Sequence, residues 1–537
     1  MMKRNAMKKL AVSISSFELL INQGCAYVDK TAHLCKLIKN YGAFFLSRPR
    51  RFGKSLTCST LEAIFQGKKE LFDGLAISCM EYDWKKHPVI HISFAEVSHK
   101  TDTELIDNVK VTLHNCAQKY GVSIDQSIAP GTYLAQLIIK LHEKHGPVAV
   151  IIDEYDKPIL DHIDDKAMVE KMQQLMRSLY GVFKGNNVGS CMRFLFITGV
   201  SRFSKVSLFS ELNNLKDLSM NEDVATMCGY TQQELEENFK EHINALAQAK
   251  GWTYQQALAE LKRWYNGFKF SNQGEKVYNP FSIAYCLDDK KIENYWFSSG
   301  TPKFMLTALT DAPEEKRNEL KEQLLTLELQ KISSSSIQNF NIARLYDNLL
   351  VLFLQTGYLT IKEYDDFASM YWLHYPNEEV RRSCTEQIML ELVQVSLDAF
   401  ADWIAKFRRA LLAGDVDTFL MHMQNFMRLI PHNVIVNREK CYQATFFTIC
   451  KLLGVHMFVE EATDLGFIDG VITTPTNVFV IEFKKDRNPA AALAQIKKNN
   501  YSYKYVVESK LPVMHVGISF YFTKGKSVSL KWLVEKA

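Results

Sequence analysis

The sequence predicts a chain of mixed α/β class, with a parallel sheet covered by helices on both faces in its N-terminal part and a second α/β domain at its C-terminal end. Three observations predict this fold. Apolar runs alternate with helical patterns early in the chain, helical periods dominate its middle, and two adjacent strand-like runs follow Gly466. The 537 residues, 47% of them hydrophobic, are enough for several buried cores. We expect four domains, at residues 1–228, 229–330, 331–425 and 426–537.

The composition predicts a soluble, globular, cytoplasmic protein. No apolar run approaches 18 residues, so no membrane span is expected. The N-terminal stretch imitates a signal peptide, but serines interrupt its apolar part and no small-residue cleavage site precedes Glu18. The eleven cysteines form no C-x-x-C pair, which favours buried free thiols in a reducing compartment over a zinc site.

The net charge of +4 is uninformative, but its distribution is not. Residues 1–60 carry eleven Lys or Arg against two acids, Glu18 and Asp29, which is a local excess of nine. Such a surface suits phosphate groups. For the lysines between Lys3 and Lys9, an ordinary solvated basic surface is the better interpretation.

The stretch FFLSRPRRFGKSL, residues 44–56, ends like a phosphate-binding loop. The apolar run 43–47 before it predicts a strand, and the helical spacing of 54–67 after it predicts a helix. In this context the helix dipole, backbone N–H groups and Lys54 would hold the β and γ phosphates of ATP. The Ser55 hydroxyl would bind Mg²⁺.

The loop departs from the usual G-x-x-x-x-G-K-[ST] pattern, because Arg48 stands where the first glycine belongs. A positive φ at that position would cost an arginine on the order of 1–2 kcal/mol, so we expect a rebuilt turn. The loop arginines could compensate by facing the triphosphate, or they could bind a partner. The nucleotide contacts expected in this loop are Arg48, Arg50, Arg51, Phe52, Gly53, Lys54, Ser55 and Leu56.

A second element lies about a hundred residues further on. The stretch PVAVIIDEYDKP, residues 147–158, is an apolar run that ends in two adjacent acids, as expected for a strand buried in a parallel sheet. Asp153 would hold Mg²⁺, and Glu154 would polarise the attacking water. A plain strand followed by a polar turn is the alternative for this stretch alone.

A third buried run, residues 193–203, carries Thr198, Ser201 and Arg202 at its end. These polar groups are placed where the carboxyl end of a strand could sense the γ-phosphate. With the run 87–94, the pattern predicts four strands alternating with helices. Because ligands of such sheets bind at the carboxyl ends of the strands, we expect the three polar sets to converge.

Several long motifs resemble the bacterial AAA-ATPase-like family. They are YVDKT (27–31), the loop itself, IIDEYDKPI (151–159), FITGVSRFSKVSLFSELNNLKDLSM (196–220), WYNGFKF (264–270), VYNPFSI (277–283) and NYWFSSGTP (294–302). The resemblance covers nearly the whole chain and implies that R-P-R-R-F-G-K-S is the normal form of the phosphate loop in this family. It also implies a characteristic C-terminal partner domain.

The middle of the chain predicts helices and a small mixed region. Residues 229–330 show amphipathic periods and an aromatic-rich connection that we expect to close over the ATPase core. The four serines at 333–336 predict a linker. A helix followed by two strand-like runs within 331–425 is compatible with a winged-helix unit. The acidic EYDDF at 363–367 favours structural coupling over DNA contact there.

The C-terminal stretch 466–486 predicts two strands joined by a TPTN turn. Glu482 and Lys484 are two residues apart and therefore point to the same side of a strand, and Asp469 could approach from the neighbouring strand. This D…E-x-K arrangement is typical of restriction-type nucleases, in which two carboxylates hold Mg²⁺ and the lysine positions or deprotonates water. An exposed strand with alternating charges is the alternative.

The flanking helical patterns offer accessory positions, which are Glu439 before the strands and Gln495, Lys497, Lys498 and Tyr501 after them, for phosphate contacts. The segment resembles the PD-(D/E)XK nuclease-like domain usually attached to the ATPase-like family. The resemblance implies a core of Asp469, Glu482 and Lys484, with Glu439 and Gln495 accessory. Phe467 replaces the arginine of the family's common G-R-x-D, so a phosphate contact could be lost.

Three functions follow from these sites. The favoured one is an ATP-driven or ATP-gated, Mg²⁺-dependent nuclease that acts on DNA. The second is a nucleotide-controlled signalling or defence switch whose nuclease-like domain only binds a partner or nucleic acid. The third is a non-catalytic nucleic-acid binder with salt-sensitive affinity. ATP and Mg²⁺ are the expected cofactors, and a homo-oligomer or a protein partner stays open.

Overall fold

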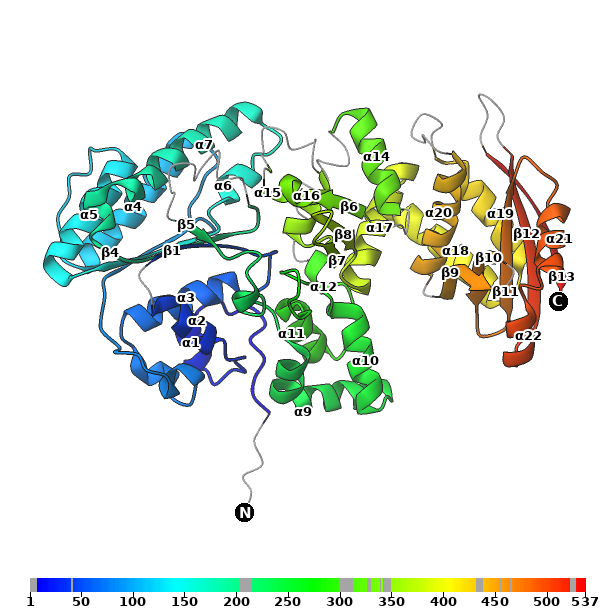
Figure 1. Cartoon of the computed structure of the whole chain (residues 1–537), viewed down its shortest axis with the longest axis horizontal. Helices are drawn as coiled ribbons and strands as arrows, with labels where there is room; N and C mark the ends of the chain where they lie inside the picture. Colours follow the sequence, from blue (N-terminus) through cyan, green and yellow to red (C-terminus); the bar gives the residue numbers. More distant parts are fainter. Residues whose placement is uncertain are drawn as a thin grey trace, which may run out of the picture. The chain divides into compact units, whose positions relative to one another are not determined.

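The chain forms two compact units. The first unit comprises Met1–Ala308 and Leu329–Arg381, and the second comprises Leu309–Glu328 and Arg382–Ala537 (Figure 1). The computed structural model describes residues 7–39, 42–202, 215–298, 312–325, 330–338, 340, 349–430, 438–453, 455–463, 466–521 and 528–537.

The first unit is built on a parallel five-stranded sheet with the order β2-β3-β4-β1-β5. The apolar runs of the sequence became its central strands because such runs suit positions buried on both faces, and β3 is buried at all six of its positions. The strands are β1 (Gly42–Ser47), β2 (Val89–Ser93), β3 (Val148–Asp153), β4 (Met192–Gly199) and β5 (Leu215–Asp217).

Helices cover both faces of this sheet, which confirms the predicted α/β class. In Figure 1, α4, α5 and α7 lie on one side of the sheet, and α1, α2 and α3 lie on the other. Their bounds are α1 (Phe17–Asn22), α2 (Thr31–Ile38), α3 (Lys54–Phe65), α4 (Asp102–Lys119), α5 (Pro130–His145) and α7 (Lys166–Tyr180), with short helices α6 (Lys157–Leu160) and α8 (Asn186–Gly189).

A helical subdomain follows the sheet in the first unit. Thr231 and Glu234 form a capping box that starts its first helix, and Leu235, Ile243 and Leu261 lie in its buried core. The predicted helical character is therefore present. The helices are α9 (Gln232–Lys250), α10 (Tyr254–Tyr265), α11 (Pro280–Asp289) and α12 (Tyr295–Ser298).

A three-stranded antiparallel sheet with the order β6-β8-β7 completes the first unit. The helix and hairpin expected here are α16 and β7–β8, but the predicted serine linker is wrong, because these serines end β6 and begin α15. The first unit ends at Arg381, within α17, and the predicted domain at 331–425 stays a prediction. The elements are β6 (Gln330–Ser333), α15 (Ser334–Gln338), α16 (Leu349–Thr356), β7 (Thr360–Asp365), β8 (Met370–His374) and α17 (Glu378–Val393).

The second unit contains a mixed five-stranded sheet with the order β13-β12-β11-β10-β9. Strands β9, β10 and β11 form an antiparallel meander, and α21 connects β11 to its parallel neighbour β12. The strands are β9 (His456–Thr463), β10 (Gly466–Thr473), β11 (Val478–Lys485), β12 (Val513–Tyr521) and β13 (Ser529–Lys536). The helices are α14 (Glu314–Leu325), α18 (Leu397–Leu412), α19 (Val416–Met427), α20 (Arg438–Leu452), α21 (Ala490–Lys498) and α22 (Tyr503–Glu508).

Helices α20 and α21 pack closely on the strands of this sheet. A Cβ at Gly470 would come within 2.5 Å of the Phe447 ring on α20. A Cβ at Gly517 would come within 2.6 Å of the Pro489 carbonyl oxygen, just before α21. Glycine at these two positions therefore lets the helices approach β10 and β12.

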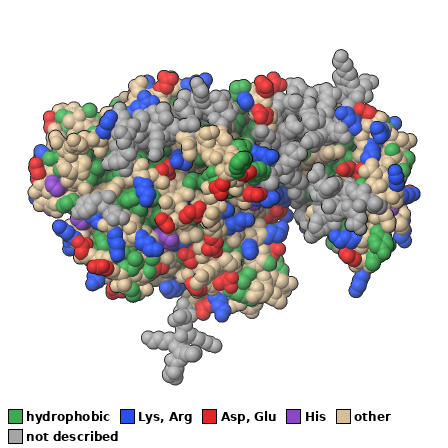
Figure 2. Space-filling view, in the orientation of Figure 1, with side chains coloured by type: hydrophobic (Ala, Val, Ile, Leu, Met, Phe, Trp, Pro, Cys, Tyr) green, Lys and Arg blue, Asp and Glu red, His purple; other side chains and the backbone are tan. Residues whose placement is uncertain are grey.

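The surface charges are mixed and the cysteines are unpaired in the described part of the chain. Acidic and basic side chains are interspersed over the face shown in Figure 2. Within the described ranges, no helix is both long and apolar enough to cross a bilayer. The ten cysteines placed by the structure are free thiols, and most are buried. A cytoplasmic location stays a prediction.

Candidate functional site

In the loop between β1 and α3, left-handed backbone occurs at positions 51 and 53 and not at position 48. Arg51 has a φ of 67° and Gly53 a φ of 87°, whereas Arg48 is not among the described residues with positive φ. Gly53 is the N-cap of α3, so the helix begins at Lys54. The turn is therefore rebuilt, as expected. Position 48 does not adopt the left-handed backbone that would favour glycine, so an arginine is tolerated there.

Arg48 does not face the triphosphate position, so that expectation is wrong. Its guanidinium is buried and donates to the carbonyl oxygens of Ser47 and Ser219 at 2.8 Å each and of Val224 at 3.2 Å. It also lies 4.3 Å from the centroid of the Phe270 ring. Burial lowers the pKa of Arg48 to about 10, which leaves the group charged at neutral pH. Arg48 therefore stabilises the loop by binding buried backbone carbonyl groups.

Replacing Arg48 with methionine should lower the stability of the protein by about 2–4 kcal/mol, because three buried carbonyl groups lose a charged donor. Urea unfolding measures this change. Arg50→Met is the matched control, since the Arg50 side chain is 35% exposed and its loss should cost less than about 0.5 kcal/mol. An Arg48→Met protein as stable as the control would contradict this stabilising role.

The structure brings Lys54, Ser55 and Asp153 together. The Lys54 Nζ donates to the carbonyl oxygens of Arg48 at 3.1 Å and of Pro49 at 3.0 Å, within its own loop. The Ser55 side chain lies near enough to the Asp153 carboxylate to influence its pKa, and Asp153 is only 2% exposed. Burial raises the pKa of Asp153, and the Ser55 side chain and the Lys54 charge oppose this shift. A buried carboxylate beside a hydroxyl is a donor set that fits Mg²⁺.

Glu154 adopts a left-handed backbone with a φ of 51°, which is rare for a residue with a Cβ. Its amide donates to Asp153 Oδ1 at 2.9 Å, so the conformation is held by the neighbouring acid. Strain of this kind is concentrated at functional sites. The turn directs the chain from β3 into α6 and leaves Glu154 bordering a cavity.

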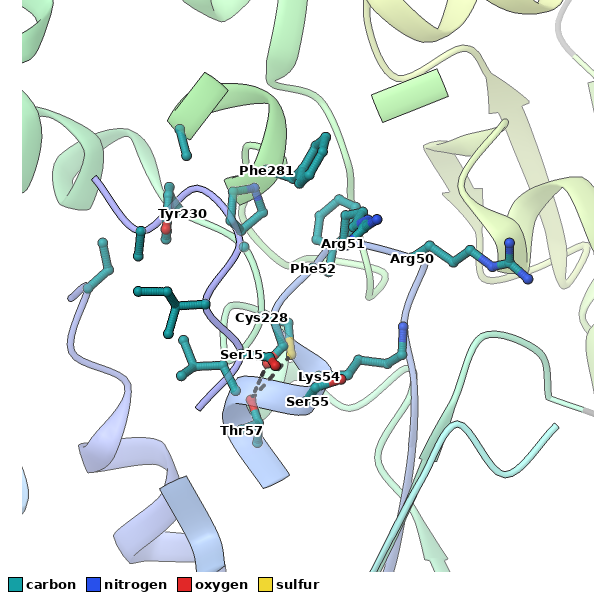
Figure 3. Close-up of a pocket in the computed structure, with 18 of the residues that line it drawn as sticks. Ser15, Arg50, Arg51, Phe52, Lys54, Ser55, Thr57, Cys228, Tyr230 and Phe281 are labelled. Carbon is teal, nitrogen blue, oxygen red and sulfur yellow. Dashed lines mark hydrogen bonds between the residues drawn. The ribbon is translucent and has the colours of Figure 1, made fainter. Parts of the chain in front are cut away.

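This cavity has a volume of about 420 Å³, within the range of small-molecule sites. Figure 3 shows Lys54 and Ser55 on one side of it and the aromatic residues Tyr230 and Phe281 on another. The guanidinium of Arg51 lies 4.8 Å from the centroid of the Phe281 ring. The cavity therefore combines a polar, cationic part with an apolar part, as a nucleotide requires. Other residues that border it are Leu10, Val12, Tyr27, Arg50, Phe52, Gly53, Leu56, Glu154 and Lys157.

Thr198 and Arg202 are not among the described residues that border the cavity. The Thr198 hydroxyl donates to the Leu46 carbonyl oxygen at 2.7 Å, and Arg202 forms an ion pair with Asp217. Their expected role in sensing the γ-phosphate stays a prediction, and these contacts do not support it. The Thr198 bond joins the neighbouring strands β4 and β1, and the Arg202 ion pair joins the segment after β4 to β5. Ser201 is likewise engaged, by the buried carboxylate of Asp156 at 2.6 Å.

Sequence reasoning missed the wall of the cavity formed by the helical subdomain. The aromatic-rich connection was expected to close over the ATPase core, but Tyr230, Phe281 and Trp296 were not predicted to border a ligand cavity. These three residues are far from the phosphate loop in the sequence, so only the fold brings them to the cavity. The Trp296 Nε1 donates to the carbonyl oxygen of Arg50 at 3.0 Å, so the subdomain contacts the phosphate loop itself.

A buried carboxylate holds this wall in place. Glu379 is fully buried at the start of α17, and its Oε1 accepts from the amides of Tyr295 and Trp296 at 2.7 Å each. Its Oε2 accepts from the Ser282 hydroxyl at 2.8 Å. Burial raises the pKa of Glu379 to about 7, although these hydrogen bonds oppose the shift.

Glu379→Gln should therefore change stability in a pH-dependent way. Because the folded-state pKa lies above the ordinary value of 4.5, the stability present below pH 4.5 is lost as the pH rises towards and through 7, by roughly 3 kcal/mol in all. The glutamine variant lacks this titration, so its melting temperature should gain on the native protein between pH 5 and pH 8. Glu378→Gln is the neighbouring control. Parallel pH profiles for Glu379→Gln and the native protein would contradict the assignment.

The three residues of the C-terminal pattern also converge. The register that pairs Gly470 with Ile481 sets Asp469 on β10 beside Glu482 on β11. Asp469 Oδ2 accepts from the Phe483 amide at 2.7 Å, and Lys484 Nζ lies 2.8 Å from Glu482 Oε1. Burial and the nearby Asp469 charge raise the pKa of Glu482, and Lys484 opposes the shift.

Two buried oxygens at this site have no hydrogen-bond partner in the described part of the chain. They are Glu482 Oε2 and the hydroxyl of Ser519. Ser519 pairs with Lys484 across β11 and β12, so both project from the same face of the sheet. An unpaired carboxylate oxygen beside a second acid and a lysine is a donor set that fits a hard divalent cation. Sequence reasoning missed Ser519, whose signal depends on strand pairing.

The predicted accessory residues of the C-terminal site differ in their burial and contacts. Tyr501 is only 3% exposed, packs in the core with Ile468 and Val480, and accepts from Asn499 at 2.8 Å, so its predicted phosphate contact is wrong. Lys497 is paired with Glu535 at 2.7 Å. Gln495 is half-buried on α21, the helix that packs on β11 and β12, and its role stays a prediction. The side chains of Glu439 and Phe467 lie outside the described residues.

Comparison with known proteins agrees with this two-part arrangement. The family "Predicted AAA-ATPase" matches residues 11–209, and the PD-(D/E)XK nuclease superfamily matches residues 437–531. An uncharacterised protein from the vnfD 5′ region of Azotobacter chroococcum mcd 1 is 32% identical over 527 residues, which are 96% of each chain.

Solved structures resemble the chain more remotely. The Walker-type ATPase PABY2304 of Pyrococcus abyssi aligns with a TM-score of 0.37 and 14% identity, over 71% of this chain and 98% of that one. The ORC2 protein of Aeropyrum pernix aligns with a TM-score of 0.30 and 12% identity, over 72% and 97%. From the family matches and the full-length relative, the chain belongs to the family of predicted AAA-ATPases with a C-terminal domain of the PD-(D/E)XK nuclease superfamily.

Proposed function

We propose that this chain binds and hydrolyses ATP in its first unit and cleaves DNA in its second unit, both with Mg²⁺. The single observation that supports this most strongly is convergence. Residues far apart in the chain form one acid–hydroxyl–lysine set at Lys54, Ser55 and Asp153 and one acid–acid–lysine set at Asp469, Glu482 and Lys484.

In the first unit, the proposed steps use side chains already in place. Lys54 would exchange the carbonyl oxygens of its own loop for the β and γ phosphates. Ser55 and Asp153 would hold Mg²⁺, which supplies positive charge to the phosphate oxygens. Glu154, held in its turn by Asp153, would orient the attacking water. Tyr230 and Phe281 would border the base.

In the second unit, Asp469 and Glu482 would hold the metal ion, which lowers the pKa of a bound water and neutralises the scissile phosphate. The Glu482 oxygen without a partner is available for this role. Lys484 lies within hydrogen-bonding distance of Glu482, so its ammonium can donate to the attacking water or to the phosphate as negative charge develops there.

The experiment is a direct assay of both activities with the full chain. Binding of ATP and ADP is measured by calorimetry, phosphate release is measured with Mg²⁺, and supercoiled plasmid is incubated with Mg²⁺, Mn²⁺ or Ca²⁺. We expect nucleotide binding, turnover, and nicking or linearisation with Mg²⁺ or Mn²⁺. No nucleotide affinity would overturn the first half of the proposal, and intact plasmid with every metal would overturn the second.

One observation favours the alternative of a nucleotide-controlled switch. Trp296 contacts the phosphate loop, and the Trp296 amide is held by Glu379 at the start of α17. Helix α17 continues past Arg381, where the chain passes from the first unit to the second. A change in the loop on ATP binding could therefore reach the second unit along the chain. Tight ATP binding with negligible turnover, and a DNA or protein affinity that depends on nucleotide, would favour this alternative.

A further inference from the structure

A cluster of charged groups reaches the polar part of the cavity through Arg50 and Lys157, and of its members only Arg50 belongs to the phosphate-loop motif. Asp161 lies at its centre. Asp161 Oδ2 is 2.9 Å from both the His99 Nε2 and the Lys157 Nζ, and Asp161 Oδ1 is 3.9 Å from the guanidinium of Arg50. We call these four residues the Asp161 cluster.

The Asp161 cluster carries more positive charge than its one carboxylate can neutralise. Both ring nitrogens of His99 face acceptors, since Nδ1 lies 2.7 Å from the Val97 carbonyl oxygen and Nε2 faces Asp161. Only the protonated ring can donate from both nitrogens, so these two acceptors favour the imidazolium form. Its hydrogen bond to Asp161 raises the pKa of His99, and the His99 and Lys157 contacts lower the pKa of Asp161 against the effect of burial. Arg50, Lys157 and, when protonated, His99 therefore share one carboxylate.

Two of these cations have access to the cavity. Arg50 and Lys157 border it together with Lys54, Ser55 and Glu154, and their side chains are 35% and 27% exposed. Figure 3 shows that Arg50 extends away from Tyr230 and Phe281, so it is not directed at the apolar part. Lys157 is the first residue of α6, three positions after Glu154, so the strained turn that places Glu154 also places Lys157.

We propose that Arg50 and Lys157 bind the terminal phosphate of a nucleoside triphosphate in cis, and that Asp161 holds the two cations until that phosphate arrives. The proposal rests on the proposed nucleotide-binding function and deepens it. Lys157 would exchange its contact with Asp161 for the γ-phosphate oxygens, and Arg50 would follow. A diphosphate lacks the group that draws the two cations away from Asp161. The cluster would therefore distinguish ATP from ADP without an arginine from another chain.

The test compares ATP and ADP binding by full-length variants, with a non-hydrolysable ATP analogue so that turnover does not interfere. Lys157→Met and Arg50→Met should each weaken binding of the ATP analogue about 10- to 100-fold, and should change ADP binding less than about threefold. Lys166→Met, an exposed lysine at the start of α7, is the matched control and should change neither. Equal effects on both nucleotides, or none, would overturn the proposal.

Asp161→Asn tests the restraining role separately. Removing the carboxylate charge frees both cations, so affinity for the ATP analogue should rise about three- to tenfold while ADP binding changes little. A fall in affinity for the ATP analogue would overturn the restraint by Asp161. His99 should lose its imidazolium character in this variant, which the ring ¹H–¹⁵N signals report independently of nucleotide.

A mixing experiment distinguishes supply in cis from supply in trans. Lys157→Met chains keep the phosphate loop, and Lys54→Ala chains keep Lys157. If the cation came from a neighbouring chain, the mixture would regain turnover, whereas supply in cis predicts none. Failure of the proposed function is recognised separately, because native protein would then bind neither nucleotide. The present proposal fails when native protein binds both nucleotides and Lys157→Met or Arg50→Met leaves the ratio of the two affinities unchanged, or when the mixture regains turnover.

Discussion

Lys54→Ala is expected to abolish nucleotide binding, with an affinity for ATP at least 100-fold lower than that of the native protein. Lys54 is 5% exposed at the start of α3, and a charge pair with phosphate at about 4 Å near a protein surface is worth about 4 kcal/mol. The two loop carbonyls that now accept from Lys54 would compete for only part of this energy. Calorimetric titration with ATP and ADP measures the loss.

The matched control is Lys68→Ala. Lys68 follows the same helix but is a third exposed and paired with Glu18 at 2.6 Å, so ATP affinity should stay within about twofold. A melting curve checks that Lys54→Ala still folds, and Lys54→Met provides a second variant with a similar side-chain volume. Native affinity in either folded variant would show that this loop does not bind phosphate.

Glu482→Gln should eliminate DNA cleavage, by a factor on the order of 10³ or more, while the protein becomes at least as stable. Glutamine keeps the shape of the side chain but removes a charge that would face a metal ion. In the absence of metal, the native carboxylate is buried with one oxygen lacking a partner in the described structure, which is costly. Plasmid cleavage with Mg²⁺ and Mn²⁺ titration measure the loss, and thermal unfolding measures the stability.

Lys485→Ala is the control for this prediction. Lys485 follows Lys484 on β11 and is exposed, so its side chain projects from the opposite face of the strand. Cleavage should stay within about threefold of the native rate. Opposite signs for activity and stability in Glu482→Gln are the mark of a group kept for function. A variant that loses stability and still cuts DNA would refute the nuclease site.

The sequence predicted the strands and side-chain pairs whose residue patterns are local. The buried strands β2, β3 and β4 were recognisable because strands covered on both faces need continuous apolar runs. The pair Glu482 and Lys484 was recognisable because a strand repeats every two residues. The serine run failed as a linker because its hydroxyl groups can bond one another and start α15 as readily as they can face water.

The sequence by itself determined the succession of strands and helices along the chain, the position of the phosphate loop before α3 and the positions of the acids at strand ends. Each of these features depends on residues that are neighbours in the chain. Only the tertiary structure decided which polar groups are available to a ligand. Arg48 is engaged by a carbonyl 171 residues away, Arg202 pairs with Asp217, and Tyr501 packs in a core. A charged side chain binds whatever partner the fold brings within about 3 Å, and no local pattern specifies that partner.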